Sequence, residues 1–506
     1  MMSERVICEK EAVWTDGAGS GVTDERVEDW LYALRHMDTL AIEHEGQPVS
    51  YRELAERVAS RAAFLAELGV TRGERVAVLM AHGLLFAITL HALRYLGAVT
   101  VPINARLSLE EMVWQVDDVE ARTLLCDEAH EVQRIAICER LSHVRAWRCA
   151  VEMKEGKRAF APDSICLSDV QSIIYTSGTT GRPKGALLTY GNHFASAVAS
   201  ALRLGMLPTD RWLTALPLFH VGGQAVLMRS IIYGTAAVLQ DRFDEAAHRA
   251  RLLQGDITMV SVVAATLLRM MDDEVTFPAA LRVVLLGGGP APAPLLKRCI
   301  ARGVPVVQTY GLTEANSQVA TLRPAEVSSR VGSAGQPLMS STVRIVDERG
   351  EYCPPNGVGE IQIKGPTLCA GYWQEKKVRS ALAEDGWFHT GDIGYLDEEG
   401  YLYVLDRRKD LIVSGGENVY PAEVEAVLLT HPSVAEAAVV GRDDATYGQV
   451  PVAVLAVHAP YDEAALLSFC RAQLAGYKVP KQLLVVDRLP RNAAGKLLKR
   501  EMRLWF

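Results

Sequence analysis

Up to Tyr310, apolar residues alternate between short continuous runs and longer stretches with helical spacing. The runs that have the length of buried strands lie at 76–80, 99–103, 124–126, 172–176, 257–263, 283–286 and 304–309. In one intervening stretch Leu109, Val113 and Val116 recur at i, i+4 and i+7, which places them on one face of a helix. This alternation predicts an α/β fold in which a mostly parallel sheet is covered by helices on both faces.

Two of the helices are expected to begin at capping boxes. Ser50 is followed three residues later by Glu53, and Ser108 is followed in the same way by Glu111. The first of these helices is expected to end near Gly69, because glycine commonly follows the last helical turn.

After Val331 the pattern changes to short alternating segments bounded by Gly and Pro, such as 360–364, which predict antiparallel strands. Residues 397–400 have the sequence of a hairpin turn, and the charged segment 406–410 follows soon after. Pro421 suits the first position of a further helix. We therefore expect a small α+β domain at the C-terminal end of the chain.

The predicted organisation has three parts. Residues 1–25 are polar and contain several glycines, which is typical of a disordered or loosely packed extension. Residues 26–408 form the large domain and residues 409–506 the small one. A chain of 506 residues is also long enough for more than one core, because single cores stop growing at about 250–300 residues.

Composition narrows the class of partner. Apolar residues make up 49% and charged residues 23%, the balance of a soluble globular protein, and the net charge is −8 without a long basic run. We therefore expect small molecules, and not nucleic acid, as partners. The sequence leaves open whether the protein forms a homo-oligomer. The nine cysteines are scattered, without a Cys-x-x-Cys pair, and no apolar run is long enough to span a membrane. These features predict a cytoplasmic protein without a zinc site or disulfide framework.

One loop, residues 175–185, concentrates glycines, hydroxyl groups and cations between the strand at 172–176 and a helix expected near Thr189. Such a loop supplies the N–H and O–H donors and positive charge that bind a polyphosphate. It is not a Walker A loop, because Lys184 follows proline and precedes glycine. Read alone, an exposed surface loop is the less favoured alternative. The candidate phosphate ligands are Thr176, Ser177, Gly178, Thr179, Thr180 and Lys184.

Six segments, taken together and in this order, resemble the motifs of the adenylate-forming superfamily of acyl-CoA ligases, luciferases and adenylation domains. They lie at 176–185, 310–314, 386–392, 406–410, 414–418 and 490–496. The resemblance covers nearly the whole chain after residue 25. It implies a large N-terminal domain with helix-covered, mostly parallel sheets and a small β-barrel-like part, followed by a mobile α+β domain.

The resemblance also implies roles for individual residues. Tyr310 would lie against adenine, Thr313 would donate to the α-phosphate, and Glu314 would hold a magnesium ion. Asp392 would accept the two ribose hydroxyls, much as acidic residues do in other nucleotide-binding folds. The remaining nucleotide contacts would come from the phosphate loop and from Gly289, Arg407 and Lys496.

Lys496 carries the main catalytic role in this reading. In the family, this lysine lies on a loop of the small domain and neutralises charge as a carboxylate attacks the α-phosphorus of ATP. Lys409 falls where the family places the hinge between the two domains. CoA is the expected thiol, because no carrier domain follows Phe506, and Gly415 with Gly416 would allow its pantetheine arm to approach the backbone.

A closer resemblance is to the 2-succinylbenzoate–CoA ligases of menaquinone biosynthesis. It is carried by the segments 216–224, 228–230, 285–292 and 308–318. Their substrate has a second carboxylate on its aromatic ring, for which Arg229 is the candidate contact, directly or through water, with Gln224 nearby. His220 would form a wall of the acyl site and take part in catalysis. An arginine on the helix surface is the equally weighted alternative for Arg229.

Three other functions stay open on the sequence alone. They are another acyl- or aryl-CoA ligase of the same superfamily, an oxidoreductase of the luciferase kind, and a regulator that only binds nucleotide. The presence of Lys184, Glu314, Asp392, Arg407 and Lys496 together disfavours the last of these.

Overall fold

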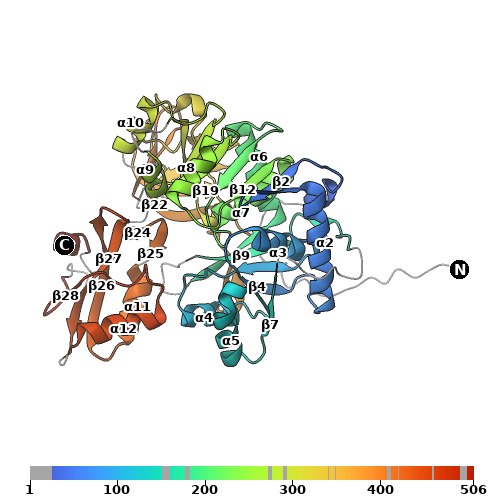
Figure 1. The fold of residues 1–506 in the computed structure, drawn as a ribbon. Helices are drawn as coiled ribbons and strands as arrows, with labels where there is room; N and C mark the ends of the chain where they lie inside the picture. The colour runs from blue at the N-terminus through green and yellow to red at the C-terminus, as the bar shows by residue number, and fades with distance from the viewer. Residues whose placement is uncertain are drawn as a thin grey trace.

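The computed structural model divides the chain into a large body and a smaller C-terminal domain that stands to one side of it (Figure 1). The structure describes residues 25–150, 160–176, 183–271, 276–288, 293–339, 341–347, 349–406, 412–419, 421–458, 461–490 and 499–506. Both the predicted extension 1–25, apart from Glu25, and the predicted boundary at 408/409 therefore lie outside the described residues.

The first sheet of the large body has eight strands. In spatial order they are β21 (Lys377–Arg379), β20 (Tyr372–Gln374), β10 (Lys184–Thr189), β9 (Val170–Thr176), β5 (Val99–Pro102), β4 (Arg75–Leu79), β6 (Thr123–Cys126) and β7 (Arg145–Arg148). The run from β9 to β7 is parallel, as the sequence predicts, and β10, β20 and β21 extend it antiparallel. A two-stranded sheet of β1 (Arg26–Val27) and β8 (Ile165–Cys166) lies apart from it.

Successive residues of β4 face two different cores, because side chains alternate across a strand. Val76 and Val78 belong to the cluster that contains α3, whereas Ala77 and Leu79 belong to the cluster that contains α4. Helices therefore cover both faces of this sheet, which confirms the expectation from the apolar runs.

The second sheet has nine strands and a parallel centre. In spatial order they are β17 (Gln336–Pro337), β16 (Ala320–Thr321), β15 (Val306–Tyr310), β14 (Val283–Gly287), β13 (Met259–Val263), β11 (Arg211–Thr214), β12 (Ala236–Leu239), β2 (Leu40–His44) and β3 (Gln47–Ser50). The strands from β15 to β2 run parallel. One hydrophobic cluster continues from this sheet to the first one.

The helices of the large body are α1 (Trp30–Ala33), α2 (Tyr51–Glu67), α3 (Leu84–Tyr95), α4 (Leu109–Asp118), α5 (Glu131–Arg140), α6 (Tyr190–Leu204), α7 (Val221–Tyr233), α8 (Glu245–Leu253), α9 (Ala264–Met270) and α10 (Ala293–Ala301). Short 3-10 turns occur at η1 (Glu128–His130), η2 (Thr313–Ala315) and η3 (Pro324–Glu326). Both predicted capping boxes are confirmed: Ser50 caps α2 with Glu53, and Ser108 caps α4 with Glu111. No helix within the described residues is long and apolar enough to cross a membrane.

Four of the antiparallel strands after Val331 form a separate sheet, namely β18 (Thr342–Val346), β19 (Gly359–Lys364), β22 (Phe388–Leu396) and β23 (Leu402–Asp406). This confirms the predicted change to antiparallel strands, and the predicted turn at 397–400 joins β22 to β23.

The small domain has its own sheet and its own cores. The strands are β25 (Glu417–Val419), β24 (Ile412–Ser414), β27 (Gly448–Val457), β26 (Val434–Asp444) and β28 (Leu483–Val485). Its helices are α11 (Pro421–Thr430), α12 (Glu463–Gln473) and α13 (Lys499–Arg503), and Pro421 is the first residue of α11 as predicted. Val424 and Leu428 pack with α12 on one side of the sheet, and Met502 packs on the other.

Candidate functional site

A cavity of about 320 Å³ lies where the two large sheets and the small domain meet. The ends of β9, β13 and β14 contribute Thr176, Val263 and Gly287, and the small domain contributes Gly416 and Glu417. Ligands of parallel α/β sheets bind beyond the carboxyl ends of the strands, so the cavity has the position expected of an active site. Most of the predicted site residues that the structure describes line it, namely Thr176, Lys184, His220, Arg229, Thr313, Glu314, Asp392 and Gly416.

The predicted phosphate loop connects β9 to β10, two paired strands that the sequence did not predict as a hairpin. β10 follows the loop and pairs antiparallel with β9, with Lys184 opposite Thr176. Residues 186–188 are apolar, which is consistent with a strand. Because a helix was expected to begin near Thr189, no separate strand was predicted before it. Residues 177–182 lie outside the described residues, so the contacts of Ser177 to Thr180 remain predictions.

Glu314 lies beside the base of that hairpin. Its Oε1 accepts a hydrogen bond from the Tyr372 hydroxyl at 2.9 Å and lies 3.5 Å from Thr176 Oγ1. The Lys184 ammonium is 5.4 Å from the centre of the Tyr372 ring. An acidic group and a cation thus face the same part of the cavity, which suits a magnesium ion bound together with phosphate oxygens.

The turn that presents Thr313 and Glu314 is tightly folded. Asn316 and Ser317 both have positive φ angles, of 49° and 93°, which non-glycine residues rarely adopt. A Cβ atom on Gly311 would lie 1.4 Å from the Ser317 carbonyl oxygen, so only glycine fits there. The chain folds back on itself at this point and holds the two side chains at the end of β15.

Asp392 lines the cavity from β22 and accepts a hydrogen bond from the Tyr310 hydroxyl at 2.6 Å. Tyr310 itself packs in the cluster with Ala315 and Val319 and is not among the described lining residues. Its position orients the carboxylate of Asp392, and its predicted contact with adenine stays a prediction.

Arg229 is buried, which makes the alternative of a helix-surface arginine wrong. Only 2% of its surface is exposed, yet it lines the cavity from α7. It donates to Ser196 Oγ at 3.2 Å, and its guanidinium carbon lies 5.5 Å from the centre of the Trp212 ring. Burial lowers the pKa of Arg229, and no carboxylate within the described part of the chain pairs with it. An unneutralised buried cation at a cavity wall is suited to bind an anion.

The two other predicted acyl-site residues, His220 and Gln224, differ in whether they reach the cavity. His220 stands at the N-cap position of α7, lines the cavity and packs edge-on against Phe219, with the two ring centres 4.6 Å apart. Gln224 is fully buried, its side-chain amide donates to the Leu218 carbonyl oxygen at 2.9 Å, and it is not among the described lining residues. The structure therefore brings His220, but not Gln224, to the cavity.

Glu417 is a site residue that sequence reasoning did not assign. Its buried carboxylate accepts from Arg106 at 2.5 Å and lies 3.1 Å from His220 Nε2. Burial disfavours the charged form, but His220, Arg106 and Lys478 outweigh it and lower the pKa of Glu417. Glu417 stands in the motif 414–418, but its partners lie hundreds of positions away and in the other domain.

The predicted CoA contacts lie in the turn between β24 and β25. Gly415 and Gly416 have φ angles of 58° and 85°. Gly416 lines the cavity, and a Cβ atom on it would lie 3.4 Å from Val263 of the large body. Gly289, Arg407, Lys409 and Lys496 lie outside the described residues, so their roles remain predictions.

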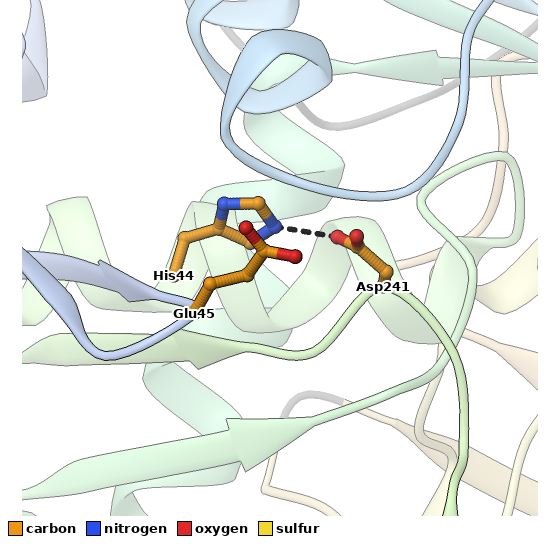
Figure 2. Close-up of side chains that lie close together, drawn as sticks. All are labelled: His44, Glu45 and Asp241. Carbon is orange, nitrogen blue, oxygen red and sulfur yellow. Dashed lines mark hydrogen bonds and ion pairs between the residues drawn. The ribbon is translucent and has the colours of Figure 1, made fainter. Parts of the chain in front are cut away.

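A second cluster of polar side chains lies outside the cavity. His44 Nε2 and Asp241 Oδ1 are 2.5 Å apart, and the Glu45 carboxylate is next to them (Figure 2). These are the described His, Cys, Asp and Glu side chains whose spacing suits a metal ion, but Glu45 and Asp241 are exposed. The contact between His44 and Asp241 joins the end of β2 to the segment after β12.

Comparison with known proteins assigns both domains to one family. The AMP-binding enzyme family matches residues 30–373, and the AMP-binding enzyme C-terminal domain matches residues 423–496. A 2-succinylbenzoate–CoA ligase from Bacillus mycoides is 46% identical over 95% of this chain and 98% of its own length. Two solved structures of o-succinylbenzoate CoA synthetase from Bacillus subtilis are each 40% identical over 95% of this chain and 98% of theirs.

The two solved structures differ in how well they match. A double mutant bound with its product analogue OSB-NCoA gives a TM-score of 0.89, whereas the complex with the acyl-adenylate intermediate OSB-AMP gives 0.73. Identity and coverage are the same in both, so the overall geometry of this chain is nearer to that of the product-analogue complex. With both domains matched and relatives nearly half identical along its length, the chain belongs to the AMP-binding enzyme family of adenylate-forming ligases.

Proposed function

We propose that this protein is a 2-succinylbenzoate–CoA ligase of menaquinone biosynthesis. In the first half-reaction the succinyl carboxylate attacks the α-phosphorus of ATP, giving the acyl-adenylate and pyrophosphate. In the second, the CoA thiol attacks the acyl carbonyl, and AMP leaves. The relatives support this choice of acid, and so does the buried Arg229, for which the described residues supply no carboxylate partner.

Several residues of this chain have separate roles in the first half-reaction. Lys184 and Thr176 bind the β- and γ-phosphates, Asp392 orients the ribose, and Thr313 donates to the α-phosphate. Glu314 would hold a magnesium ion, which would supply positive charge for the phosphate oxygens. Lys496 supplies a further cation at the reacting carboxylate and phosphate.

The acyl pocket distinguishes the two carboxylates of the substrate. Arg229 binds the carboxylate of the ring, directly or through water, and His220 lines the wall beside it. The succinyl carboxylate is then left to face the nucleotide. A substrate without the ring carboxylate leaves the buried cation of Arg229 unneutralised, which disfavours its binding.

Arg229→Ala is expected to raise the KM for 2-succinylbenzoate by about 10- to 100-fold while changing the KM for ATP by less than about threefold. The matched substrate is 3-benzoylpropionate, which is the same acid without the ring carboxylate. The wild-type protein should prefer 2-succinylbenzoate strongly, and the variant should lose that preference. Steady-state kinetics on both acids measure this. Equal losses for the acids, or for ATP and the acid, would remove the assignment.

The second half-reaction needs open backbone at Gly416. Gly416→Val adds a branched side chain at a φ of 85°, where even a Cβ atom would lie 3.4 Å from Val263, so it should obstruct the predicted approach of the pantetheine arm. We expect thioester formation from preformed acyl-adenylate to slow at least about tenfold, with adenylate formation retained. Gly400→Val is the control, because Gly400 has a φ of 78° but nothing within 4 Å. Equal effects of the two variants would show that strain alone is responsible.

The direct test incubates the protein with ATP, magnesium, CoA and 2-succinylbenzoate and detects AMP and the thioester by mass. The second candidate is another acyl- or aryl-CoA ligase of the same superfamily, and a panel of fatty and plain aromatic acids tests it. Activity on the panel without activity on 2-succinylbenzoate would favour the second candidate. A cytoplasmic location belongs to the proposal, because ATP and CoA are available there.

A further inference from the structure

The segment between β5 and α4 holds the small domain against the large body. Arg106, just before α4, donates to Glu417 of β25 at 2.5 Å. Ser108, the N-cap residue of α4, donates through its hydroxyl to the carbonyl oxygen of Gln473 at the end of α12, at 2.6 Å. Both contacts exist only in an arrangement of the domains like the one observed.

A third contact from the same segment is a buried ion pair. Lys478 of the small domain is 4% exposed, and its ammonium lies 2.8 Å from Glu111 of α4. It also lies 2.7 Å from Glu423 of α11, in its own domain. Removing one partner of a buried pair is strongly unfavourable, because it leaves a charge without compensation. The Lys478–Glu111 contact therefore contributes to the relative stability of this domain arrangement.

The charges of the three side chains do not balance, because the carboxylates of Glu111 and Glu423 share the single ammonium of Lys478. Burial raises the pKa of Glu423, and Glu111 adds to this rise, although Lys478 opposes it. When the small domain moves away, Lys478 keeps Glu423 as its partner. Glu111 then remains favourably placed at the N-terminus of α4, where its Oε2 accepts from the Ser108 amide at 2.8 Å. Glu111 and Lys478 thus each keep a partner when the domains separate, which makes the contact between them reversible.

We infer that Lys478 and Glu111 form an interdomain latch that holds the small domain in the orientation for thioester formation, with Glu423 as the competing partner that allows release. The assignment to the thioester step rests on the proposed function. The latch itself rests on the ion pair, its burial and its place between the domains. Lys478, Glu111 and Glu423 are positioning residues in this scheme, because they act through the orientation of the domains.

Two substitutions should shift the domain equilibrium in opposite directions. In Glu111→Gln the side-chain oxygen can still cap Ser108, but the amide group then faces Lys478 and the attraction is lost. This variant should slow thioester formation from preformed acyl-adenylate by about tenfold and leave adenylate formation within about twofold. Glu423→Gln removes the competing carboxylate. It should favour the latched orientation and slow adenylate formation by about threefold to tenfold without slowing thioester formation.

Glu110→Gln is the matched control. Glu110 stands in the same turn of α4, but its carboxylate pairs with Arg140 of the large body at 2.6 Å. The Glu110→Gln variant should leave the rates of both half-reactions and the domain orientation unchanged. Lys478→Met is a second way to open the latch. Thermal unfolding of every variant identifies any loss of folding.

Domain orientation can be measured without substrate, which separates failure of the latch from failure of the proposed function. Spin labels on a genetically encoded ketone residue at exposed Val132 and Leu429 avoid the native cysteines and report the distance between the domains. Glu111→Gln and Lys478→Met should decrease the population at the distance of this structure, and Glu423→Gln should increase it. Unchanged distance distributions, or equal changes in both half-reactions, would overturn the latch.

Discussion

Replacing Lys496 with alanine should slow pyrophosphate release from ATP and 2-succinylbenzoate by about 10²- to 10³-fold. The reason is electrostatic, because this side chain is expected to neutralise the negative charge that gathers on the carboxylate and the α-phosphate as they approach each other. ATP binding should change by less than about threefold, since the phosphate loop, Asp392 and Glu314 remain. Rapid-quench measurement of pyrophosphate and calorimetric titration with ATP check the two halves of the prediction.

The control for Lys496→Ala is Lys499→Met. Lys499 lies three residues further along, and its ammonium pairs with Glu425 of the small domain at 2.6 Å. Its loss removes one cation from the same region of the chain without touching the reaction. Thioester formation from preformed acyl-adenylate should survive in both variants, because the first chemical step is bypassed. Pyrophosphate release at the wild-type rate in Lys496→Ala would remove the catalytic role.

Local signals in the sequence predicted most of the large body. The alternation along β4 is an example, because Val76 and Val78 face one helical layer while Ala77 and Leu79 face the other. The capping box at Ser108 likewise predicted the start of α4 to the residue. Such features depend on neighbours within a few positions, so a single chain displays them directly.

Contacts between distant parts of the chain could not be predicted in this way. The burial of Arg229 depends on Trp212 and Ser196, which lie on β11 and α6, and the isolated helix pattern was consistent with an exposed arginine. Glu417 gains its partners Arg106 and His220 only when the small domain docks on the large one. The residues of the site were largely predictable from motifs, whereas the charges that surround them required the fold.

Replacing Glu314 with glutamine should reduce adenylate formation on the order of 10²-fold and raise the magnesium concentration needed for half-maximal rate by at least about tenfold. The change preserves shape, because the glutamine oxygen can still accept from the Tyr372 hydroxyl, which now donates at 2.9 Å. What is lost is one negative charge beside the phosphate loop. Pyrophosphate release measured across a magnesium titration tests the prediction, and binding of magnesium-free ATP should be unaffected.

Tyr372→Phe separates the charge of Glu314 from its orientation. This variant keeps the carboxylate but removes the hydroxyl that holds Oε1, so it should cost less than about tenfold, in line with a single hydrogen bond to a charged group. The magnesium dependence should then lie between those of the wild type and Glu314→Gln. If Glu314→Gln changed the KM for the acid and left the magnesium titration as in the wild type, Glu314 would belong to the acyl site. A role as metal ligand predicts the opposite order of effects, because a magnesium ion held by Glu314 would supply its charge to the phosphates of ATP and not to the acid.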